Sequence, residues 1–558
     1  MMNRDVRMNG LVAGLGRALM IAVIYVVTTP AFAQSAQVTL TFKAGSATVD
    51  ARFDLSEAVD VLRFAGNGEV RLKSWVPSDG ARLNSDGTAL LLPTPQKSFS
   101  VQLKAFERDG MLDRVYSPVV LFGDGRGAQI YSEYLLPKGG GFVSLATPGV
   151  VLGRSFAKGA TVWRANDAAT YIVAGVGYTK TTTAYDITLD SALPRWVVQS
   201  LDQQVKALMH LYTRKFGSRP QRKPWIVVSF NPAGSGFRGD TNPGMVRLNL
   251  MGQSWEVENE GQSYQLASFL AHELFHLWNA GLWNMQHQEP IWLYEGGADA
   301  AAHHALNLSG FSSAERYRNE RASSLTGCSS ANGVTLANKI AGGGRTHYTC
   351  GAAVFYLAAA MGEDNGDAIG PLDLWADMFA SHQTRSYATA DLLRVAAKRA
   401  LHPASATVAT PRRYLDELAE STLPWRDVLA QGQQAFQLHQ VKPDEAIPPA
   451  VAAKLLGQLV IDRFAHDCDG KISVYDDHQV YQLDALDSCH RIRNTLTLTH
   501  LGGYSMRDNA VMAVTYAREQ CAKGLDLHFG GKGDVSLDLP CSQMPPVPPG
   551  LFVPNLGS

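Results

Sequence analysis

The sequence lacks several features that mark whole classes of protein. It contains no phosphate-binding glycine loop, no dinucleotide fingerprint and no internal repeat, which argues against nucleotide-dependent enzymes and repeat architectures. Its 50 basic and 51 acidic residues nearly cancel, so no charge excess points to nucleic acid as a partner. Beyond residue 33 no apolar run reaches the roughly 20 residues that a membrane-spanning helix needs. We therefore expect no nucleic-acid partner and no stable membrane insertion.

Cysteine is scarce. The chain has six cysteines in 558 residues and none in C-x-x-C spacing, which excludes a zinc finger or zinc ribbon. Six cysteines suggest three disulfides if the protein is exported, although the sequence does not give their connectivity. Pairing of nearest neighbours along the chain would join Cys328 to Cys350, Cys468 to Cys489, and Cys521 to Cys541.

The first 33 residues have the pattern of an export signal. Three arginines precede a short apolar core from Ala18 to Val27, and Ala31-Phe32-Ala33 provides a cleavage site before Gln34. The apolar core is too short to stay in a membrane as a spanning helix. We expect a mature chain that begins at Gln34 and is exported, either to the periplasm or out of the cell.

The hydrophobic pattern divides the rest of the chain into three parts. Residues 34–190 carry short alternating runs between turn residues, which predicts an all-β, sandwich-like N-terminal domain. In residues 191–440 a strand-bearing segment is followed by mostly helical segments, an α+β pattern. Residues 441–558 mix strands with one clear helix and predict a small C-terminal α+β domain. The mature length exceeds what one core usually supports, so we expect a multi-domain protein.

A metal-binding pattern is what the sequence does contain. Residues 272–276 read His-Glu-Leu-Phe-His in a segment of helical periodicity, so His272 and His276 lie one turn apart on one face. Eighteen residues separate His276 from Glu295, whose carboxylate completes a His₂Glu set with a fourth position open, as in catalytic zinc sites. Glu273 stands where a general base would stand. We expect one Zn²⁺ per chain on these three ligands.

Asp299 is a candidate support for this site. It falls one turn after Glu295 on the same helical face. A carboxylate there can accept the free ring N–H of a ligand histidine and fix the tautomer of that histidine. The alternative for the whole pattern is an ordinary amphipathic helix with surface His and Glu.

The sequence around these residues resembles a known group of enzymes. His-Glu-Leu-Phe-His-Leu-Trp-Asn followed by Ile-Trp-Leu-Tyr-Glu-Gly-Gly-Ala resembles the gluzincin zinc metallopeptidases. The spacing and Trp-Leu-x-Glu-Gly are similar to the alanyl aminopeptidase family, and the Trp-Asn pair to the glycyl aminopeptidase family. The resemblance implies an exported, aminopeptidase-like zinc metallopeptidase with a peptide or protein as substrate. It implies a thermolysin-like fold for residues 191–440, the three zinc ligands named above, and Glu273 as general base.

A second motif resembles the same families. Tyr348-Thr349-Cys350-Gly351-Ala352 is similar to their Tyr-x-Lys-Gly-Ala, with Cys350 in place of lysine. In those families the tyrosine hydroxyl donates to the oxyanion of the tetrahedral intermediate, so the resemblance implies this role for Tyr348. His347 is a rival donor, and a packed aromatic at a helix start is the alternative for Tyr348.

One family motif is missing. These aminopeptidases hold the substrate amine with a glutamate in Gly-x-Met-Glu-Asn, just before an edge strand that pairs with the peptide. This chain offers an alternating strand from residue 242 to 250 without the glutamate. An acidic run at residues 256–260 is a possible substitute or a solvated loop. The residues expected to bind the substrate are Gly244, Met245, Val246 and Arg247.

Two other classes of function remain open. The first is a catalytically inactive gluzincin scaffold that binds peptides or envelope proteins, which the missing amine anchor and Cys350 favour. The complete ligand set with Glu273 argues against it, because a binding protein has no need of a general base. The second is a zinc-stabilised structural protein, although such sites usually have four protein ligands. Glycyl aminopeptidases end in a PDZ domain, of which residues 441–558 resemble at most a degenerate form.

Overall fold

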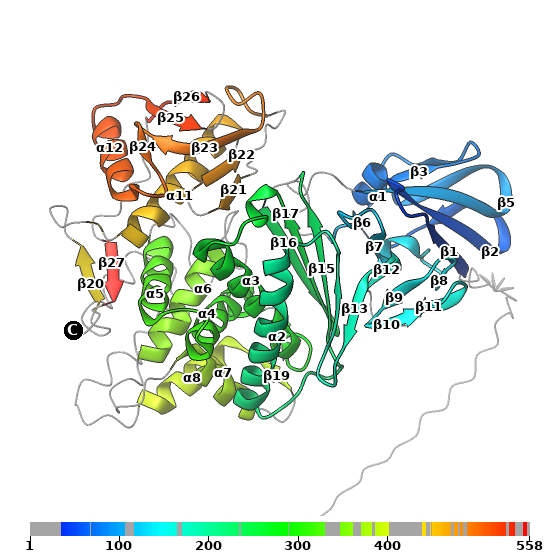
Figure 1. Cartoon of the computed structure of the whole chain (residues 1–558), viewed down its shortest axis with the longest axis horizontal. Coiled ribbons are helices and arrows are strands. Elements are labelled where there is room, and N and C mark those ends of the chain that lie inside the picture. Colours follow the sequence, from blue (N-terminus) through cyan, green and yellow to red (C-terminus); the bar gives the residue numbers. More distant parts are fainter. Residues whose placement is uncertain are drawn as a thin grey trace, which may run out of the picture.

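The computed structural model shows a multi-domain α+β protein with several β-sheets (Figure 1). The expected export signal lies outside the residues that it describes. Those are residues 35–66, 68–105, 116–164, 170–233, 236–287, 289–329, 346–360, 370–381, 385–400, 438–441, 447, 449–469, 474–477, 480–483, 488–531, 535–541 and 551–554.

Two sheets that share one core form the N-terminal part. The first has the order β11-β8-β1-β2-β5-β3, with β4 on β5, and the second has the order β10-β9-β12-β7-β6. Alternate residues of strands from both sheets, such as Val38, Phe53 and Ile130, fill the space between them, as the alternating sequence pattern predicts. The first sheet comprises β1 (Ala36–Phe42), β2 (Thr48–Arg63), β3 (Trp75–Pro77), β4 (Arg82–Leu83), β5 (Ala89–Lys104), β8 (Gly141–Leu145) and β11 (Ala160–Arg164). The second comprises β6 (Val119–Leu121), β7 (Gly127–Tyr131), β9 (Gly149–Val151), β10 (Arg154–Phe156) and β12 (Tyr171–Gly175), with α1 (Gly68–Ser74) and the 3₁₀ turn η2 (Ser132–Leu135) alongside.

A third sheet carries the candidate site. Its order is β13-β14-β15-β17-β16, in which the three central strands are parallel and the two edge strands are antiparallel to their neighbours. The strands are β13 (Tyr178–Thr181), β14 (Asp186–Leu189), β15 (Trp225–Asn231), β16 (Gly236–Asn242) and β17 (Met245–Met251). The domain boundary expected at residue 190 follows β14, so the strands on both sides of that point belong to one sheet.

The strand predicted to bind substrate is not an edge strand. β17 lies between β15 and β16, and every residue in it is buried. Its backbone therefore already pairs on both sides and cannot pair with a peptide. Gly244 lies in the turn before β17, and Met245, Val246 and Arg247 are fully buried. The expectation that this strand is an edge was wrong, because alternation identifies a strand but not its neighbours. The burial of Met245, Val246 and Arg247 gives no support to substrate binding there, and the role of these residues and of Gly244 stays a prediction. The edge is β16.

Helices cover the third sheet and continue beyond it. They are α2 (Arg195–Phe216), α3 (Glu260–Asn279), α4 (Ile291–Ser309), α5 (Ala314–Ser329), α6 (Thr346–Ala360), α7 (Pro371–Ala380) and α8 (Thr389–Ala400), with η3 (Gln253–Trp255) before α3. Two short strands, β18 (Asn284–Met285) and β19 (Ser386–Tyr387), pair between them. One large apolar core joins these elements.

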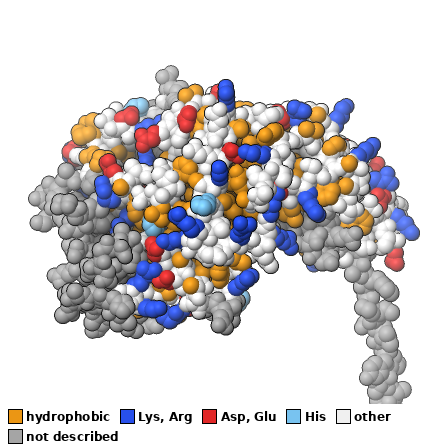
Figure 2. Space-filling view, turned by 60° about the horizontal axis from the view of Figure 1, so that its bottom comes forward, with side chains coloured by type: hydrophobic (Ala, Val, Ile, Leu, Met, Phe, Trp, Pro, Cys, Tyr) orange, Lys and Arg blue, Asp and Glu red, His pale blue; other side chains and the backbone are white. Residues whose placement is uncertain are grey.

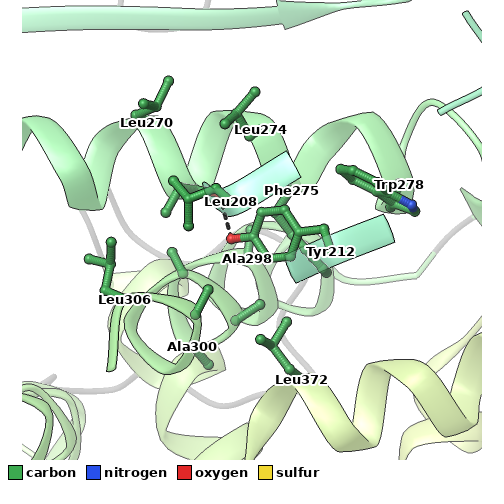
Figure 3. Close-up of a cluster of buried hydrophobic side chains, with 14 of the residues drawn as sticks. Leu208, Tyr212, Leu270, Leu274, Phe275, Trp278, Ala298, Ala300, Leu306 and Leu372 are labelled. Carbon is green, nitrogen blue, oxygen red and sulfur yellow. Dashed lines mark hydrogen bonds between the residues drawn. The ribbon is translucent and has the colours of Figure 1, made fainter. Parts of the chain in front are cut away.

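The apolar side of α3 faces this core (Figure 3). Leu270, Leu274 and Trp278 recur every fourth residue and are buried in this core, where the ring of Trp278 contacts that of Tyr212 in α2. The hydroxyl of Tyr212 in α2 donates to the carbonyl of Ala271 in α3 at 2.9 Å. These contacts fix the rotation of α3 about its own axis, and so decide which of its residues face the candidate site.

α3 begins one turn earlier than its hydrophobic periodicity suggests. The side chain of Asn259 accepts a hydrogen bond from the backbone N–H of Gln262, and Glu260 supplies an acidic residue in the first turn. Both features stabilise a helix N-terminus. Of the acidic run at residues 256–260, only Glu260 lies in the helix, and Glu256 and Glu258 precede it. Glu260 lies twelve residues from His272, about 18 Å along the axis, so this residue supplies no carboxylate to the site.

The second N-terminal sheet packs on the third sheet. Tyr131 and Tyr171 from the former share a buried cluster with Trp225 and Met245 from the latter. The guanidinium of Arg247 lies 4.5 Å from the ring centroid of Tyr171. This interface holds the N-terminal part against the β16–β17 hairpin.

A small α+β unit follows. Helices α11 (Pro449–Asp467) and α12 (Ala510–Ala522) share a core with a sheet of order β21-β22-β23-β25-β26, with β24 on β23. β21 also contacts the edge strand β16. The degenerate PDZ likeness stays a prediction. The strands are β21 (Val474–Asp477), β22 (Val480–Leu483), β23 (Leu496–Leu501), β24 (Tyr504–Ser505), β25 (Leu527–Gly531) and β26 (Ser536–Leu539), and a separate pair joins β20 (Leu438–Val441) to β27 (Leu551–Pro554).

All six cysteines form disulfides between nearest neighbours along the chain, which are Cys328–Cys350, Cys468–Cys489 and Cys521–Cys541. Three disulfides fit an exported protein. None of the described helices combines the length and apolar character that crossing a bilayer requires. Basic and acidic side chains lie intermixed over the face of the molecule that Figure 2 draws.

Candidate active site

Helices α3 and α4 bring His272, His276 and Glu295 together. The Nε2 atoms of the two histidines lie 3.0 Å apart. Oε2 of Glu295 lies 3.2 Å from Nε2 of His272 and 3.4 Å from Nε2 of His276. The three atoms form a nearly equilateral triangle at the crossing of the two helices. The structure thus brings together the three residues that the sequence predicts as zinc ligands.

The outer nitrogens of both imidazoles are engaged elsewhere. Nδ1 of His272 lies 2.8 Å from Oδ1 of Asp299, and Nδ1 of His276 lies 2.8 Å from Oδ1 of Asn279. The Asn279 amide is oriented by its own donation from Nδ2 to the carbonyl of Tyr294, so its oxygen faces the imidazole. Each Nδ1 therefore carries the proton and donates it, which leaves both Nε2 atoms as acceptors when the rings are neutral.

This donor set fits a zinc ion. When both imidazoles are neutral, three atoms with lone pairs converge at one point, the two Nε2 atoms and Oε2 of Glu295. Ligands at 2.0–2.1 Å from a tetrahedral centre are about 3.3–3.4 Å apart, within a few tenths of an ångström of the triangle's edges of 3.0, 3.2 and 3.4 Å. The second group of close His, Cys, Asp and Glu atoms in the described residues contains Asp467, Cys468 and Cys489. Its cysteines are disulfide-bonded and so are not thiolate ligands.

The electrostatics of the site also favour a cation. Burial by itself lowers the pKa of His272, but its hydrogen bonds with Asp299 and Glu295 outweigh burial and raise that pKa to about 10. Burial by itself raises the pKa of Glu295, but the hydrogen bonds of His272 and His276 bring it well below the usual range. The carboxylates thus draw positive charge to the imidazoles. A divalent cation provides this charge while the imidazoles stay neutral.

Glu273 lies between α3 and the edge strand β16. It is buried, and burial raises its pKa. The hydroxyl of Thr241 in β16 lies 2.7 Å from Oε2 of Glu273 and 2.9 Å from the backbone carbonyl oxygen of the same residue. A Cβ on Gly239 would lie 2.9 Å from Oε1 of Glu273. One face of β16 therefore contacts both oxygens of the carboxylate.

Two glycines bring Tyr348 to the ligands. α4 and α6 cross so closely that a Cβ on Gly296 would lie 2.4 Å from the Cα of Gly351, and a Cβ on Gly351 would lie 2.3 Å from a carbonyl of α4. The crossing places the first turn of α6 beside the candidate metal ligands, where the ring centroid of Tyr348 lies 5.9 Å from that of His272. The ring of His347 lies next to that of Tyr348. Tyr348 thus has a ring contact with a candidate ligand, and which of the two residues donates to the oxyanion stays a prediction.

Three residues of the site were not predicted. Asn279 follows His276 by three residues, and the one-turn spacing that identifies Asp299 would have found it. Thr241 and Gly239 precede the strand that the alternation picked out, and only the pairing of β16 with β17 brings them to Glu273.

Comparisons with known proteins agree with this architecture. No family model matches the sequence, and a search of curated proteins finds no relative. Among solved structures, the chain is similar to an aminopeptidase N family protein from Idiomarina loihiensis, with a TM-score of 0.53 and 11% sequence identity. The similarity covers 93% of this chain and 98% of that chain. At this identity the likeness shows the fold, so the chain has an aminopeptidase N-like, multi-domain α+β architecture.

Proposed function

We propose that the protein is an exported zinc-dependent peptidase of the aminopeptidase type. The observation that carries this proposal is the triangle of His272, His276 and Glu295 beside a buried Glu273. An aminopeptidase N-like fold supports it. The orienting bonds from Asp299 and Asn279 support a built metal centre over an accidental cluster, because ligand histidines in proteins characteristically donate their outer N–H to such partners.

His272, His276 and Glu295 would hold zinc, which when bound supplies Lewis-acid polarisation of the scissile carbonyl and of the attacking water. Glu273 takes a proton from the water and gives it to the leaving amine, since it is the carboxylate beside the ligands that is not itself a ligand. The hydroxyl of Tyr348 donates to the oxyanion that forms on the substrate.

The edge strand β16 is the proposed docking strand for the peptide. It hydrogen-bonds to β17 on one side, and among the described residues no strand pairs with its other side. It also packs on α3, which carries the base. A peptide added to this edge in extended form passes beside Glu273, so that main-chain hydrogen bonds hold it in place.

The test is a Glu273→Gln substitution. Glutamine has the same shape and cannot accept the proton, so we expect a loss of roughly 10²–10⁴-fold in the rate of peptide cleavage with one zinc retained per chain. A peptide mixture digested by the wild-type and variant proteins is read by mass spectrometry, and zinc is measured by elemental analysis. Glu315→Gln on the exposed start of α5 is the matched control and should cleave like the wild type.

The products decide the kind of peptidase. Stepwise loss of N-terminal residues supports the aminopeptidase type, whereas internal cuts would replace it with an endopeptidase. A wild-type protein that binds zinc and cleaves nothing would instead be the inactive scaffold. If Glu273→Gln cleaves at the wild-type rate, the proposed mechanism is wrong.

A further inference from the structure

We propose that Thr241 is a positioning residue for Glu273. Its hydroxyl fixes one carboxylate oxygen of the base, and Gly239 leaves room for the other oxygen to reach the reacting water. This inference rests on the proposed peptidase function and adds the strand half of the site to it. The Thr241 hydroxyl contacts Glu273, so it acts through that residue.

First, Gly239 and Thr241 lie on the same face of β16, next to Glu273. Side chains two residues apart point to the same face of a strand, so positions 239 and 241 share the face that packs on α3. Thr241 Oγ1 lies 2.7 Å from Oε2 of Glu273. Gly239 lies against the other oxygen, because a Cβ there would stand 2.9 Å from Oε1 and 2.2 Å from the ring of Phe269. Thr241 therefore hydrogen-bonds one carboxylate oxygen, Oε2, whereas Gly239 leaves space beside the other, Oε1.

Second, the Thr241 hydroxyl donates its proton to one of two acceptors. Thr241 has one proton to donate and two acceptors within reach, Oε2 and the backbone carbonyl oxygen of Glu273. The carboxylate is the stronger acceptor, since hydrogen bonds to an ionised oxygen are about twice as strong as neutral ones. Donation to Oε2 restricts the rotation of the buried carboxylate. The free oxygen is then Oε1, on the side where Gly239 offers no side chain.

Third, an ion pair on the opposite face of β16 attaches the strand to the protein. Asp240 pairs with Arg247, whose side chain is fully buried between the second N-terminal sheet and the third sheet. An edge strand has backbone partners on one side only, so this ion pair is a second attachment of β16 to the protein. It holds the strand in register next to α3, which in turn fixes where the Thr241 hydroxyl lies.

The experiment compares three single variants in the full-length exported protein. Thr241→Val keeps the shape and removes the donor, so we expect kcat to fall by roughly 10- to 100-fold with KM, zinc content and Tm close to the wild type. Thr241→Ser keeps the hydroxyl and should restore most of kcat. Thr179→Val changes a hydroxyl-bonded threonine on the opposite edge strand β13 and should leave kcat unchanged.

A role in stability alone predicts another pattern. If Thr241→Val lowers Tm or zinc content while kcat per bound zinc stays at the wild-type value, Thr241 only ties β16 to α3 and the inference is overturned. Gly239→Ala is a fourth variant, for the case in which the Thr241→Val protein does not fold. It should lower kcat by displacing Oε1 or Phe269, and a wild-type kcat there also counts against the inference.

Failure of this inference differs from failure of the proposed function. If Glu273→Gln is inactive and Thr241→Val is fully active, the peptidase stands and the positioning role falls. If Glu273→Gln cleaves peptides like the wild type, the proposed function falls whatever Thr241 does.

Discussion

The candidate site has a helical half and a strand half, and the two are built differently. The helical half holds the three candidate metal-ligand atoms within 3.4 Å of each other, and both of its histidines are oriented by residues of α3 or α4. The strand half consists of β16, an edge strand paired with β17, whose contact with the site is a hydroxyl on Glu273. The first half is complete within two helices, and the second depends on sheet pairing and on the N-terminal part.

This difference in construction suggests that the helical half binds the metal and the strand half orients the general base. Substitutions in the helical half should abolish or weaken zinc binding. Changes in the strand half should leave the metal and lower the rate of the chemical step. Glu273 belongs to both halves, because α3 carries it and β16 orients it. If zinc content and kcat changed together for variants in both halves, this division of the site would be wrong.

The largest effect is expected for a metal ligand. His276→Ala removes one corner of the triangle, so we expect loss of the bound zinc and a fall of roughly 10³-fold or more in kcat/KM. Elemental analysis after dialysis measures the bound zinc, and steady-state kinetics measure kcat/KM. Full zinc content in this variant would show that the metal sits elsewhere.

A smaller effect is expected for the residue that orients this ligand. Asn279→Leu removes the acceptor of the His276 N–H in a fully buried position, so zinc affinity should fall about 10- to 100-fold. Asn279→Asp keeps an acceptor and is the matched control. Competition with a chromophoric chelator gives the affinities. Equal affinity in the wild-type and leucine variants would mean that the tautomer of His276 is set by something else.

The smallest effect on catalysis is expected for a disulfide. Cys328–Cys350 ties α5 to the turn of α6 that carries Tyr348. Replacing both cysteines by alanine should lower kcat roughly three- to tenfold by loosening the oxyanion donor, with zinc retained. Each disulfide of this loop length contributes about 3 kcal/mol to stability.

The disulfide Cys521–Cys541 provides the comparison, because it closes a segment of similar length, 20 residues against 22, in the C-terminal unit. Removing it should lower the unfolding temperature of that unit and leave kcat as it is. Differential scanning calorimetry and kinetics on both double variants measure this. An equal loss of kcat in the two would show a general effect of stability.

The same division explains what could be predicted from the sequence. His272, His276 and Asp299 follow from helical spacing, because a helix places residues one turn apart on one face whatever surrounds it. The N-terminal strands also follow from local pattern, whereas the disulfide connectivity does not. β16 does not, because its place beside α3 is set by long-range pairing. Alternation marked β17 as a strand, yet gave no sign that β17 would be covered on both sides.

The measurement that tests the central claim most directly is a crystal structure of the zinc-loaded protein with anomalous diffraction recorded at the zinc edge. The account predicts one strong peak per chain, about 2.0–2.1 Å from Nε2 of His272, Nε2 of His276 and Oε2 of Glu295, with Thr241 still bonded to Glu273. No peak among these three atoms, or a peak ligated by other residues, would contradict it.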